Sequence, residues 1–330
     1  MLPKLYIGPM SREIVDVAIK SGLDLGLIPS RRQVDHDGGY VSDTKTLVEY
    51  VRKNSTKIKI QRDHGGPSQG ISKDDGVDSI IKDSENKLDL IHIDPWKAFQ
   101  DIETAALTSS ILIGTSLNIN ESSLFEVGTE EAIRKYSALE LEDFLNKLKK
   151  NLGERFESVK FAVIQSGVGL LGVTNTGKFD EQRCKDMVSV CKDFNLLSKE
   201  HNGDYLEPDL IKRRFELGLD GINIAPELAV EQTRAILKQI KEEKLLNELF
   251  KACFDSKFWV KWLSEGFDPQ DEYEKRLLTE VCCHYIYNTS EFKQIYFESD
   301  IDDKAVNSAL ENKIKSLNES CCLPNRDGRR

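Results

Sequence analysis

The sequence lacks several features that would assign it to a common class of protein. No apolar run approaches the roughly 18 residues that a membrane-spanning helix needs. No signal peptide precedes the first strand-like segment, so we expect a cytoplasmic protein. The net charge of −10 leaves no excess of basic residues, which argues against a protein that binds nucleic acid or an anionic membrane.

Cysteine and glycine motifs are also missing. The seven cysteines are an odd number without CxxC spacing, which predicts free thiols and argues against a zinc site built from cysteine. No GxGxxG sequence follows the first strand-like segment, so a dinucleotide-binding fold is not indicated. No P-loop or other nucleotide motif supports a kinase.

What the chain does contain is a repeated alternation of short apolar segments with amphipathic ones. Eight such repeats favour a closed (β/α)8 TIM barrel over an open doubly wound sheet. After about residue 244 the strand signals stop and amphipathic helices take over. We therefore expect a barrel in residues 1–243 and a helical C-terminal extension, ending in a frayed tail, in residues 244–330. The expected strands are 5–8, 23–28, 57–61, 89–93, 124–127, 159–165, 196–200 and 221–224.

Polar side chains gather at the C-terminal ends of these segments, where barrel enzymes carry their chemistry. Neutral imidazoles with a carboxylate are the ligands that a divalent metal such as zinc prefers. His64 and His201 are the first candidates, and Glu126 or Gln165 could complete the shell. His92 is expected to support a ligand or to contact the substrate.

Proton transfer and substrate binding are assigned to other residues at the same strand ends. Asp63, next to His64, is the expected general acid/base, and Glu126 is a second catalytic carboxylate. Gly167, Asn223 and the turn before a helix at Glu227 could hold a phosphate through backbone amides. The other expected substrate contacts are Ser30, Arg31, Gln33, His92, Gln165 and Asp204.

Short segments along nearly the whole chain carry a family resemblance. They are Gln33-Val34, Gly38-Gly39-Tyr40, Asp63-His64 with Gly66-Pro67, Ile91-His92-Ile93-Asp94, Val127-Gly128-Thr129-Glu130, Gln165 with Gly167-Val168, Glu200-His201 with Asp204-Tyr205, and the stretch 259–266. In this order they resemble the class II aldolase superfamily, and within it the D-tagatose-bisphosphate aldolase subunit family. The resemblance implies a catalytic acid at Asp63 and metal ligands at His64 and His201.

The resemblance implies a metal-dependent aldolase that makes or breaks a carbon–carbon bond in a phosphorylated ketose or related sugar, as a homo-oligomer or with an aldolase subunit. The chain departs from the family at Gln165, where class II aldolases usually supply a further histidine. This departure favours an alternative, a non-catalytic partner that stabilises a separate tagatose-bisphosphate-type aldolase. A third alternative is a sugar isomerase or epimerase, with Glu126 or Glu130 as a second acid/base.

Overall fold

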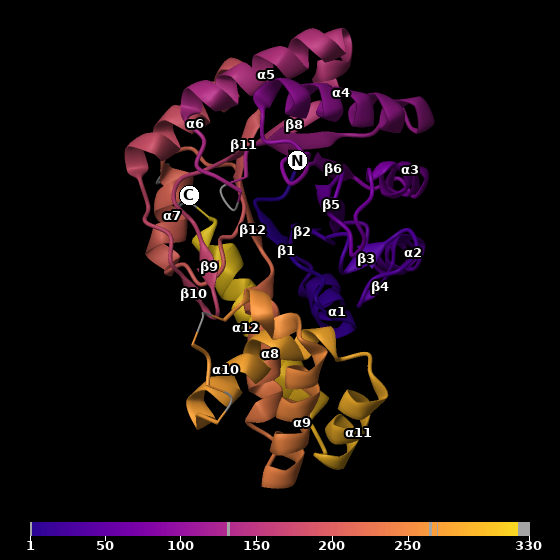
Figure 1. The fold of residues 1–330 in the computed structure, drawn as a ribbon, viewed down its shortest axis with the longest axis vertical. Coiled ribbons are helices and arrows are strands. Elements are labelled where there is room, and N and C mark those ends of the chain that lie inside the picture. Colours follow the sequence, from indigo (N-terminus) through magenta and orange to yellow (C-terminus); the bar gives the residue numbers. More distant parts are fainter. Residues whose placement is uncertain (1, 131–132, 264–265, 269, 323–330) are drawn as a thin grey trace, which may run out of the picture.

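The computed structural model describes residues 2–130, 133–263, 266–268 and 270–322. Its centre is a closed barrel of eight parallel strands in the spatial order β1-β12-β11-β8-β7-β6-β5-β2, which confirms the predicted fold class (Figure 1). The barrel strands are β1 (Leu5–Ile7), β2 (Leu25–Leu27), β5 (Lys59–Gly65), β6 (Leu90–Ile93), β7 (Phe125–Gly128), β8 (Val159–Ile164), β11 (Leu197–Glu200) and β12 (Gly221–Ile224).

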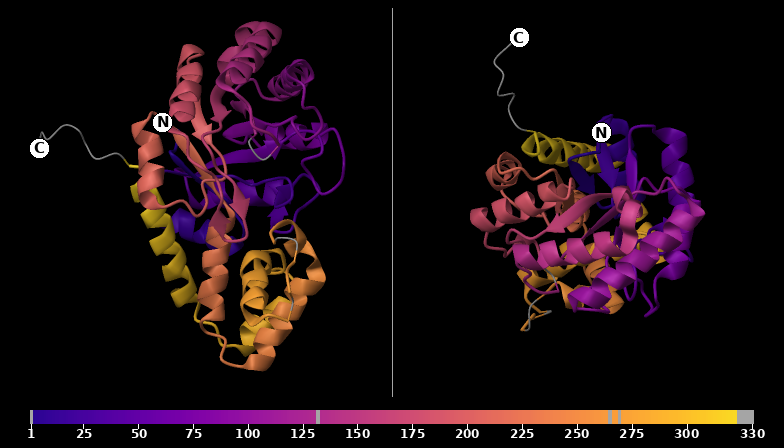
Figure 2. Two further views of the ribbon diagram at one scale, coloured as in Figure 1. Left: turned by 60° about the vertical axis from the view of Figure 1, so that its left-hand side comes forward. Right: turned by 90° about the horizontal axis from the view of Figure 1, so that it is seen from above.

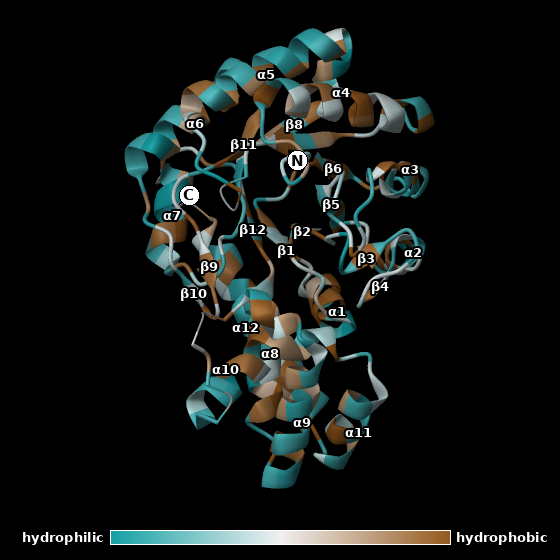
Figure 3. Ribbon diagram, in the orientation of Figure 1, coloured by the Kyte–Doolittle hydropathy of each residue, from teal (hydrophilic) through white to brown (hydrophobic). Residues whose placement is uncertain are grey.

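Helices surround the barrel because the strands bury both of their faces and need apolar cover on the outside. The helices present polar residues outward, as on α3 and α5 in Figure 3. Among the described residues, no helix combines the length and the apolar character needed to cross a membrane. The surrounding helices are α1 (Arg12–Ser21), α2 (Thr44–Asn54), α3 (Val77–Glu85), α4 (Ile102–Ile119), α5 (Ala138–Leu152), α6 (Glu181–Asp193), α7 (Pro208–Glu216) and α8 (Pro226–Leu237).

Some element boundaries differ from the sequence-based expectation. The strand expected over 57–61 is β5, which continues to Gly65, so that Asp63 and His64 belong to the strand itself. Helix α4 begins later than residue 97, because Asp101 caps it by accepting a hydrogen bond from the Thr104 amide. These shifts leave the order of strands and helices unchanged.

Two loops at the C-terminal ends of the strands carry small sheets of their own. The loop after β2 holds β3 (Val34–Asp35) paired in parallel with β4 (Ser42–Asp43). The loop after β8 holds the antiparallel pair β9 (Leu170–Leu171) and β10 (Thr174–Asn175). We call the ring formed by the C-terminal ends of the strands and these loops the barrel mouth.

The helical extension packs partly on itself and partly on the barrel. Helices α9 (Glu243–Ser256), α10 (Glu272–Cys282) and α11 (Ser290–Glu298) share a separate apolar core, and α11 was not predicted. Helix α12 (Asp303–Ser320) turns back to pack against α1, α7 and α8 (Figures 1 and 2). All seven cysteines are free, as expected. Most of the expected frayed tail, from residue 323 onward, lies outside the described residues.

Candidate metal centre

Strand β5 delivers two adjacent side chains to the barrel mouth. In a regular strand Asp63 and His64 would point to opposite faces. The pairing of β5 with β6 shifts its register between Arg62 and Gly65, and His64 has a positive φ of 50°. This bulge brings the two side chains together, with 3.7 Å between Asp63 Oδ2 and His64 Nε2.

Three histidines from separate strands meet around one carboxylate. His64 lies on β5, His92 on β6 and His201 directly after β11. Their ring centroids lie 5.2 Å (His64–His92), 5.1 Å (His64–His201) and 4.9 Å (His92–His201) apart. Glu130 Oε1 lies 3.2 Å from His201 Nδ1, 3.7 Å from His92 Nε2 and 3.9 Å from His64 Nδ1. These four residues, here called the His/Glu cluster, each offer a ligand atom within 4.8 Å of the others.

The His/Glu cluster fits a divalent metal ion. His92 Nε2, His201 Nδ1 and Glu130 Oε1 are buried; among the described residues His92 Nε2 has no hydrogen-bond partner, and His201 Nδ1 and Glu130 Oε1 have only each other, 3.2 Å apart. Such atoms are expensive to leave unsatisfied in a protein interior. Ligand atoms about 2.1 Å from a tetrahedral zinc ion lie about 3.4 Å apart, close to the separations seen here. A cation between the rings would satisfy all three atoms at once.

Two further carboxylates hold the rings of the cluster. His64 Nδ1 lies 2.7 Å from Asp94 Oδ2, and His201 Nε2 lies 2.8 Å from Glu126 Oε1. A carboxylate on one ring nitrogen orients the other toward a metal, as for His201, whose Nδ1 faces Glu130. In His64, Asp94 holds Nδ1, which is also the nitrogen on the Glu130 side. Burial opposes the charged form of His64, but Asp63 and other nearby carboxylates prevail and raise its pKa to about 9. Burial lowers the pKa of His92, which favours the neutral form that binds metal.

Below the cluster, the barrel interior contains a buried lysine that the sequence analysis did not single out. Lys199 Nζ lies 3.0 Å from Glu126 Oε2 and 2.7 Å from Gln61 Oε1, and 3.2 Å from the centre of the Tyr6 ring. Burial lowers the pKa of Lys199 to about 8, although Glu126 acts in the opposite direction. Glu126 thus joins the lysine to His201, rather than lying among the four members of the cluster.

Three of the predicted site residues, Asp63, Asn223 and Ser30, lie at the border of the cluster. Asn223 Nδ2 donates a hydrogen bond of 3.2 Å to Asp63 Oδ1. Asp63 Oδ1 lies 3.9 Å from His201 Nδ1, and the backbone of Asp63 bridges to Ser30 on the neighbouring strand end. Asp63 is therefore fixed at the edge of the cluster, with its side chain 14% exposed to solvent.

Other predicted site residues bond elsewhere. Gln165 accepts a hydrogen bond from the Tyr136 amide and donates one to the Arg134 carbonyl oxygen. Arg31 is buried and forms ion pairs with two carboxylates, at 2.8 Å and 2.6 Å. Gln33 accepts from the Ser30 amide at 2.9 Å and directs its amide nitrogen to a methionine sulfur. These contacts tie loops of the barrel mouth to one another.

The predicted phosphate cradle before α8 is occupied by a side chain of the protein itself. Asp204 Oδ1 accepts hydrogen bonds from the amides of Ala225 (2.9 Å) and Glu227 (2.8 Å). Burial, aided by the charge of Glu227, raises the pKa of Asp204 to about 8. Gly167 has a φ of 100°, and a Cβ there would lie 2.0 Å from the Lys178 carbonyl oxygen. Gly167 therefore allows its own loop segment and the segment at Lys178 to pass close to each other.

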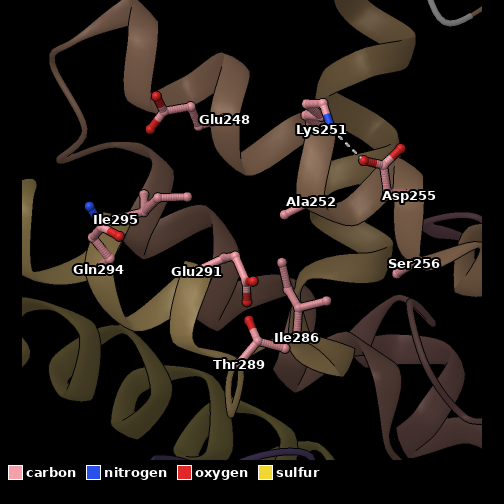
Figure 4. A pocket seen from close by; sticks show the side chains of 10 residues that line it. All are labelled: Glu248, Lys251, Ala252, Asp255, Ser256, Ile286, Thr289, Glu291, Gln294 and Ile295. Atoms are coloured by element: carbon pink, nitrogen blue, oxygen red, sulfur yellow. Dashed lines mark hydrogen bonds and ion pairs between the residues drawn. The ribbon is translucent and has the colours of Figure 1, made fainter.

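A large hollow of about 630 Å³ lies in the helical extension, between α9 and α11 (Figure 4). Three carboxylates line it, from Glu248, Asp255 and Glu291. Its lysine, Lys251, is paired with Asp255 at 2.6 Å. The lining includes no member of the His/Glu cluster, so the hollow is separate from the candidate metal centre.

Three residues of the centre were not predicted in their observed places. His92, expected to support a ligand or to contact the substrate, is itself a member of the cluster. Glu130 was considered only as an acid/base of an isomerase, and it lies in the loop after β7, whose path the sequence pattern does not define. For Lys199 a signal existed. It is two residues before His201, and residues at this spacing on a strand share one face.

No protein-family model and no curated protein matches the chain. Solved structures match its fold over most of its length. One is described as a probable tagatose 6 phosphate kinase from Sinorhizobium meliloti 1021, with TM-score 0.82, 14% identity, and coverage of 96% of this chain and 100% of the other. The chain therefore shares a barrel fold with this protein at a very low sequence identity.

Two other matching structures are enzymes of sugar metabolism by their descriptions. A fructose-bisphosphate aldolase from Campylobacter jejuni has TM-score 0.54 and 10% identity, covering 96% of this chain and 90% of its own. A fructuronate-tagaturonate epimerase from Cohnella laeviribosi has TM-score 0.61 and 11% identity, and the match covers 96% of this chain and 81% of the epimerase chain. At these identities the likeness establishes the fold, and the chemistry depends on the side chains of this chain.

Proposed function

We propose that the protein is a metal-dependent aldolase of the class II type, acting on a phosphorylated ketose or related sugar with zinc as the metal. The observation that carries this proposal is the convergence of three buried ligand atoms, from His92, His201 and Glu130, beside the carboxylate of Asp63. The barrel fold, shared with aldolases of known structure, supports the same class of enzyme.

The residues around the cluster would have different roles in such a reaction. A bound divalent ion supplies Lewis-acid polarisation of a substrate carbonyl. Asp63 exchanges the proton of the aldol hydroxyl, because its carboxylate lies at the edge of the cluster and is partly open to solvent. Asn223 holds Asp63 Oδ1, and Asp94 and Glu126 hold the histidine rings, so the groups are oriented before substrate arrives.

Metal analysis and a retro-aldol assay on the purified protein test this proposal. Asp63→Asn should keep its zinc and lose turnover by roughly 10²–10⁴-fold, since only proton transfer is removed. Glu130→Gln should lower the zinc content, and Glu121→Gln, at an exposed position, is the matched control that should change neither. Full turnover by the zinc-loaded Asp63→Asn protein would refute the role of Asp63.

A sugar epimerase is the second candidate, because two carboxylates that could serve as acid and base, Asp63 and Glu130, lie 3.9 Å and 3.2 Å from His201 Nδ1. Glu130 would then be the second acid/base. The products separate the two reactions: an aldolase releases two shorter carbon chains, whereas an epimerase changes configuration and keeps the chain length. A zinc-loaded protein that turns over nothing alone, but increases the activity of a separate aldolase subunit, would instead be the non-catalytic partner.

A further inference from the structure

The buried lysine of the barrel interior lies on the same strand as one of the cluster histidines. Lys199 is in β11, and His201 follows two positions later, so the two side chains share one face of the strand. Lys199 is the only lysine that is fully buried in the part of the chain that the structure describes. Lysine is almost never fully buried without a partner, so the groups around its ammonium indicate what it does.

A single carboxylate connects this lysine to the His/Glu cluster. Lys199 Nζ lies 3.0 Å from Glu126 Oε2, and Glu126 Oε1 lies 2.8 Å from His201 Nε2. The opposite ring nitrogen, His201 Nδ1, is the atom that faces Glu130, at 3.2 Å. Glu126 Oε1 is also 3.8 Å from His92 Nδ1. One oxygen of Glu126 therefore faces the lysine, and the other faces the rings of two cluster histidines.

The packing of the barrel interior holds the ammonium group in place. Lys199 Nζ donates a 2.7 Å hydrogen bond to Gln61 Oε1 and lies 3.2 Å from the centre of the Tyr6 ring. A Cβ atom on Gly221 would lie 3.2 Å from Lys199 Cγ, and one on Gly26 would lie 2.0 Å from the Tyr6 ring. These two glycines make room for the lysine and the tyrosine, whose positions are then set by close contact.

The orientation of His201 depends on what its Nε2 meets. An ionised carboxylate only accepts hydrogen bonds, so Glu126 Oε1 requires the proton of His201 on Nε2 and leaves the lone pair of Nδ1 for a metal. Glu126 Oε2 is buried without a hydrogen-bond partner among the described residues, and its ion pair with Lys199 is the contact that fixes it. Without the ammonium group, the carboxylate would be held at one oxygen only.

We propose that Lys199 is a positioning residue of the metal centre, which fixes the Glu126 carboxylate so that His201 presents Nδ1 to a divalent cation. This inference rests on the metal centre of the proposed function. It gives the lysine a role beyond the neutralisation of a buried charge, and the role is exerted through Glu126 rather than by contact with the cation.

Positioning and simple charge make opposite predictions for the removal of this lysine. On charge alone, loss of a positive group near the centre should strengthen the binding of a divalent cation, because like charges repel. If Lys199 positions His201, its loss should weaken binding, because a ligand whose supporting group is free to move is no longer held toward the cation.

A cobalt(II) titration of the metal-free full chain measures this effect without a catalytic readout. Cobalt(II) reports its own affinity and, through its visible absorption spectrum, the arrangement of its ligands. Lys199→Met should weaken binding roughly ten- to a hundredfold, as the loss of groups that orient a ligand does elsewhere, and should change the spectrum. In a Glu126→Gln background, where the link to His201 is already altered, Lys199→Met should change the affinity by less than about twofold.

The matched control removes a different buried ion pair of the same strand. Arg214 and Glu200 are fully buried and lie 2.6 Å apart, and Glu200 points to the face of β11 opposite to that of Lys199 and His201. Arg214→Met should therefore destabilise the protein as Lys199→Met does, and bind cobalt(II) like wild type with the same spectrum. If Lys199→Met does not fold, Lys199→Gln, a neutral side chain, replaces it and should weaken binding in the same direction.

The outcomes separate this inference from the proposed function. Weaker cobalt(II) binding by Lys199→Met in a protein without aldolase activity supports the positioning role while the proposed function fails. An active aldolase in which Lys199→Met binds cobalt(II) as tightly as wild type, or more tightly, overturns the positioning role. Equal losses of affinity in Lys199→Met and Arg214→Met also overturn it, because destabilisation would explain both. A wild-type chain that binds no cobalt(II) overturns the positioning role and the metal centre together.

Discussion

Removing the buried amine of Lys199 should destabilise the protein strongly, because two polar groups lose their partner at once. Lys199 and Glu126 are both completely buried, and Lys199 Nζ lies 3.0 Å from the Glu126 carboxylate and 2.7 Å from Gln61 Oε1. At an effective dielectric constant of about 20, opposite charges at this distance attract by about 5 kcal/mol. We expect Lys199→Met to lower the free energy of unfolding by about 3–5 kcal/mol, since the Glu126 carboxylate would stay buried without its cation.

A second substitution, Glu126→Gln, should change the free energy of unfolding in opposite directions in the wild-type and Lys199→Met backgrounds. In the wild-type background, Glu126→Gln removes the partner of Lys199 and should also destabilise by about 3–5 kcal/mol. In the Lys199→Met background the same change removes a buried charge that keeps only the His201 ring as a partner, so it should restore about 1–3 kcal/mol. Urea unfolding of the four metal-free proteins, followed by circular dichroism, measures both effects. If Glu126→Gln destabilises the two backgrounds equally, the ion pair is not what makes these residues compatible with the barrel core.

Two further predictions concern buried charges away from the histidines. Arg62→Met should lower the free energy of unfolding by more than about 3 kcal/mol, because the buried guanidinium binds Asp83 and two carbonyl oxygens. The control Arg12→Met, which breaks an exposed ion pair, should change the free energy of unfolding by less than about 0.5 kcal/mol. Equal effects of the two substitutions would contradict the reasoning. The pKa of Asp204 rises from its ordinary value of 3.8 to about 8 on folding, so its contribution to stability is complete at low pH and is lost as the pH rises through about 8. The midpoint temperature of thermal unfolding should therefore fall less between about pH 6 and pH 9 for Asp204→Asn than for wild type. If the midpoint falls equally with pH in both proteins, Asp204 is ionised in the native state.

The barrel could be predicted because its signal is local and repeated. Each strand is a short apolar run that ends in polar residues, and this pattern depends on the strand and its burial alone. The bulge in β5 could not be predicted in the same way. It arises from the pairing of Arg62 and Gly65 with β6, and a sequence pattern of one strand contains no information on the register of its neighbour.

The same distinction separates the predicted from the unpredicted parts of the candidate site. His64, His92 and His201 were placed at the barrel mouth because the ends of parallel strands must meet there. Glu130 reaches the cluster by a different route. The Thr129 amide donates to the Val163 carbonyl oxygen, and Gly128 has a φ of 142°, so the chain crosses toward β8 before Glu130 turns inward. That path depends on tertiary contacts rather than on local periodicity.

Charge balance gives a reason for a cation at the His/Glu cluster that is independent of any resemblance to aldolases. Three carboxylates at the barrel mouth are buried: Asp94, Glu126 and Glu130. Lys199 is paired with only one of them, and uncompensated carboxylates are unfavourable in a protein interior. Protonation of His64 and His201 would restore the balance, but it would leave His92 Nε2 at 3.7 Å from Glu130, too far for a hydrogen bond. A divalent cation between the rings would supply the missing charge and would also give His92 Nε2 a partner, so it would meet two requirements that protons meet only in part.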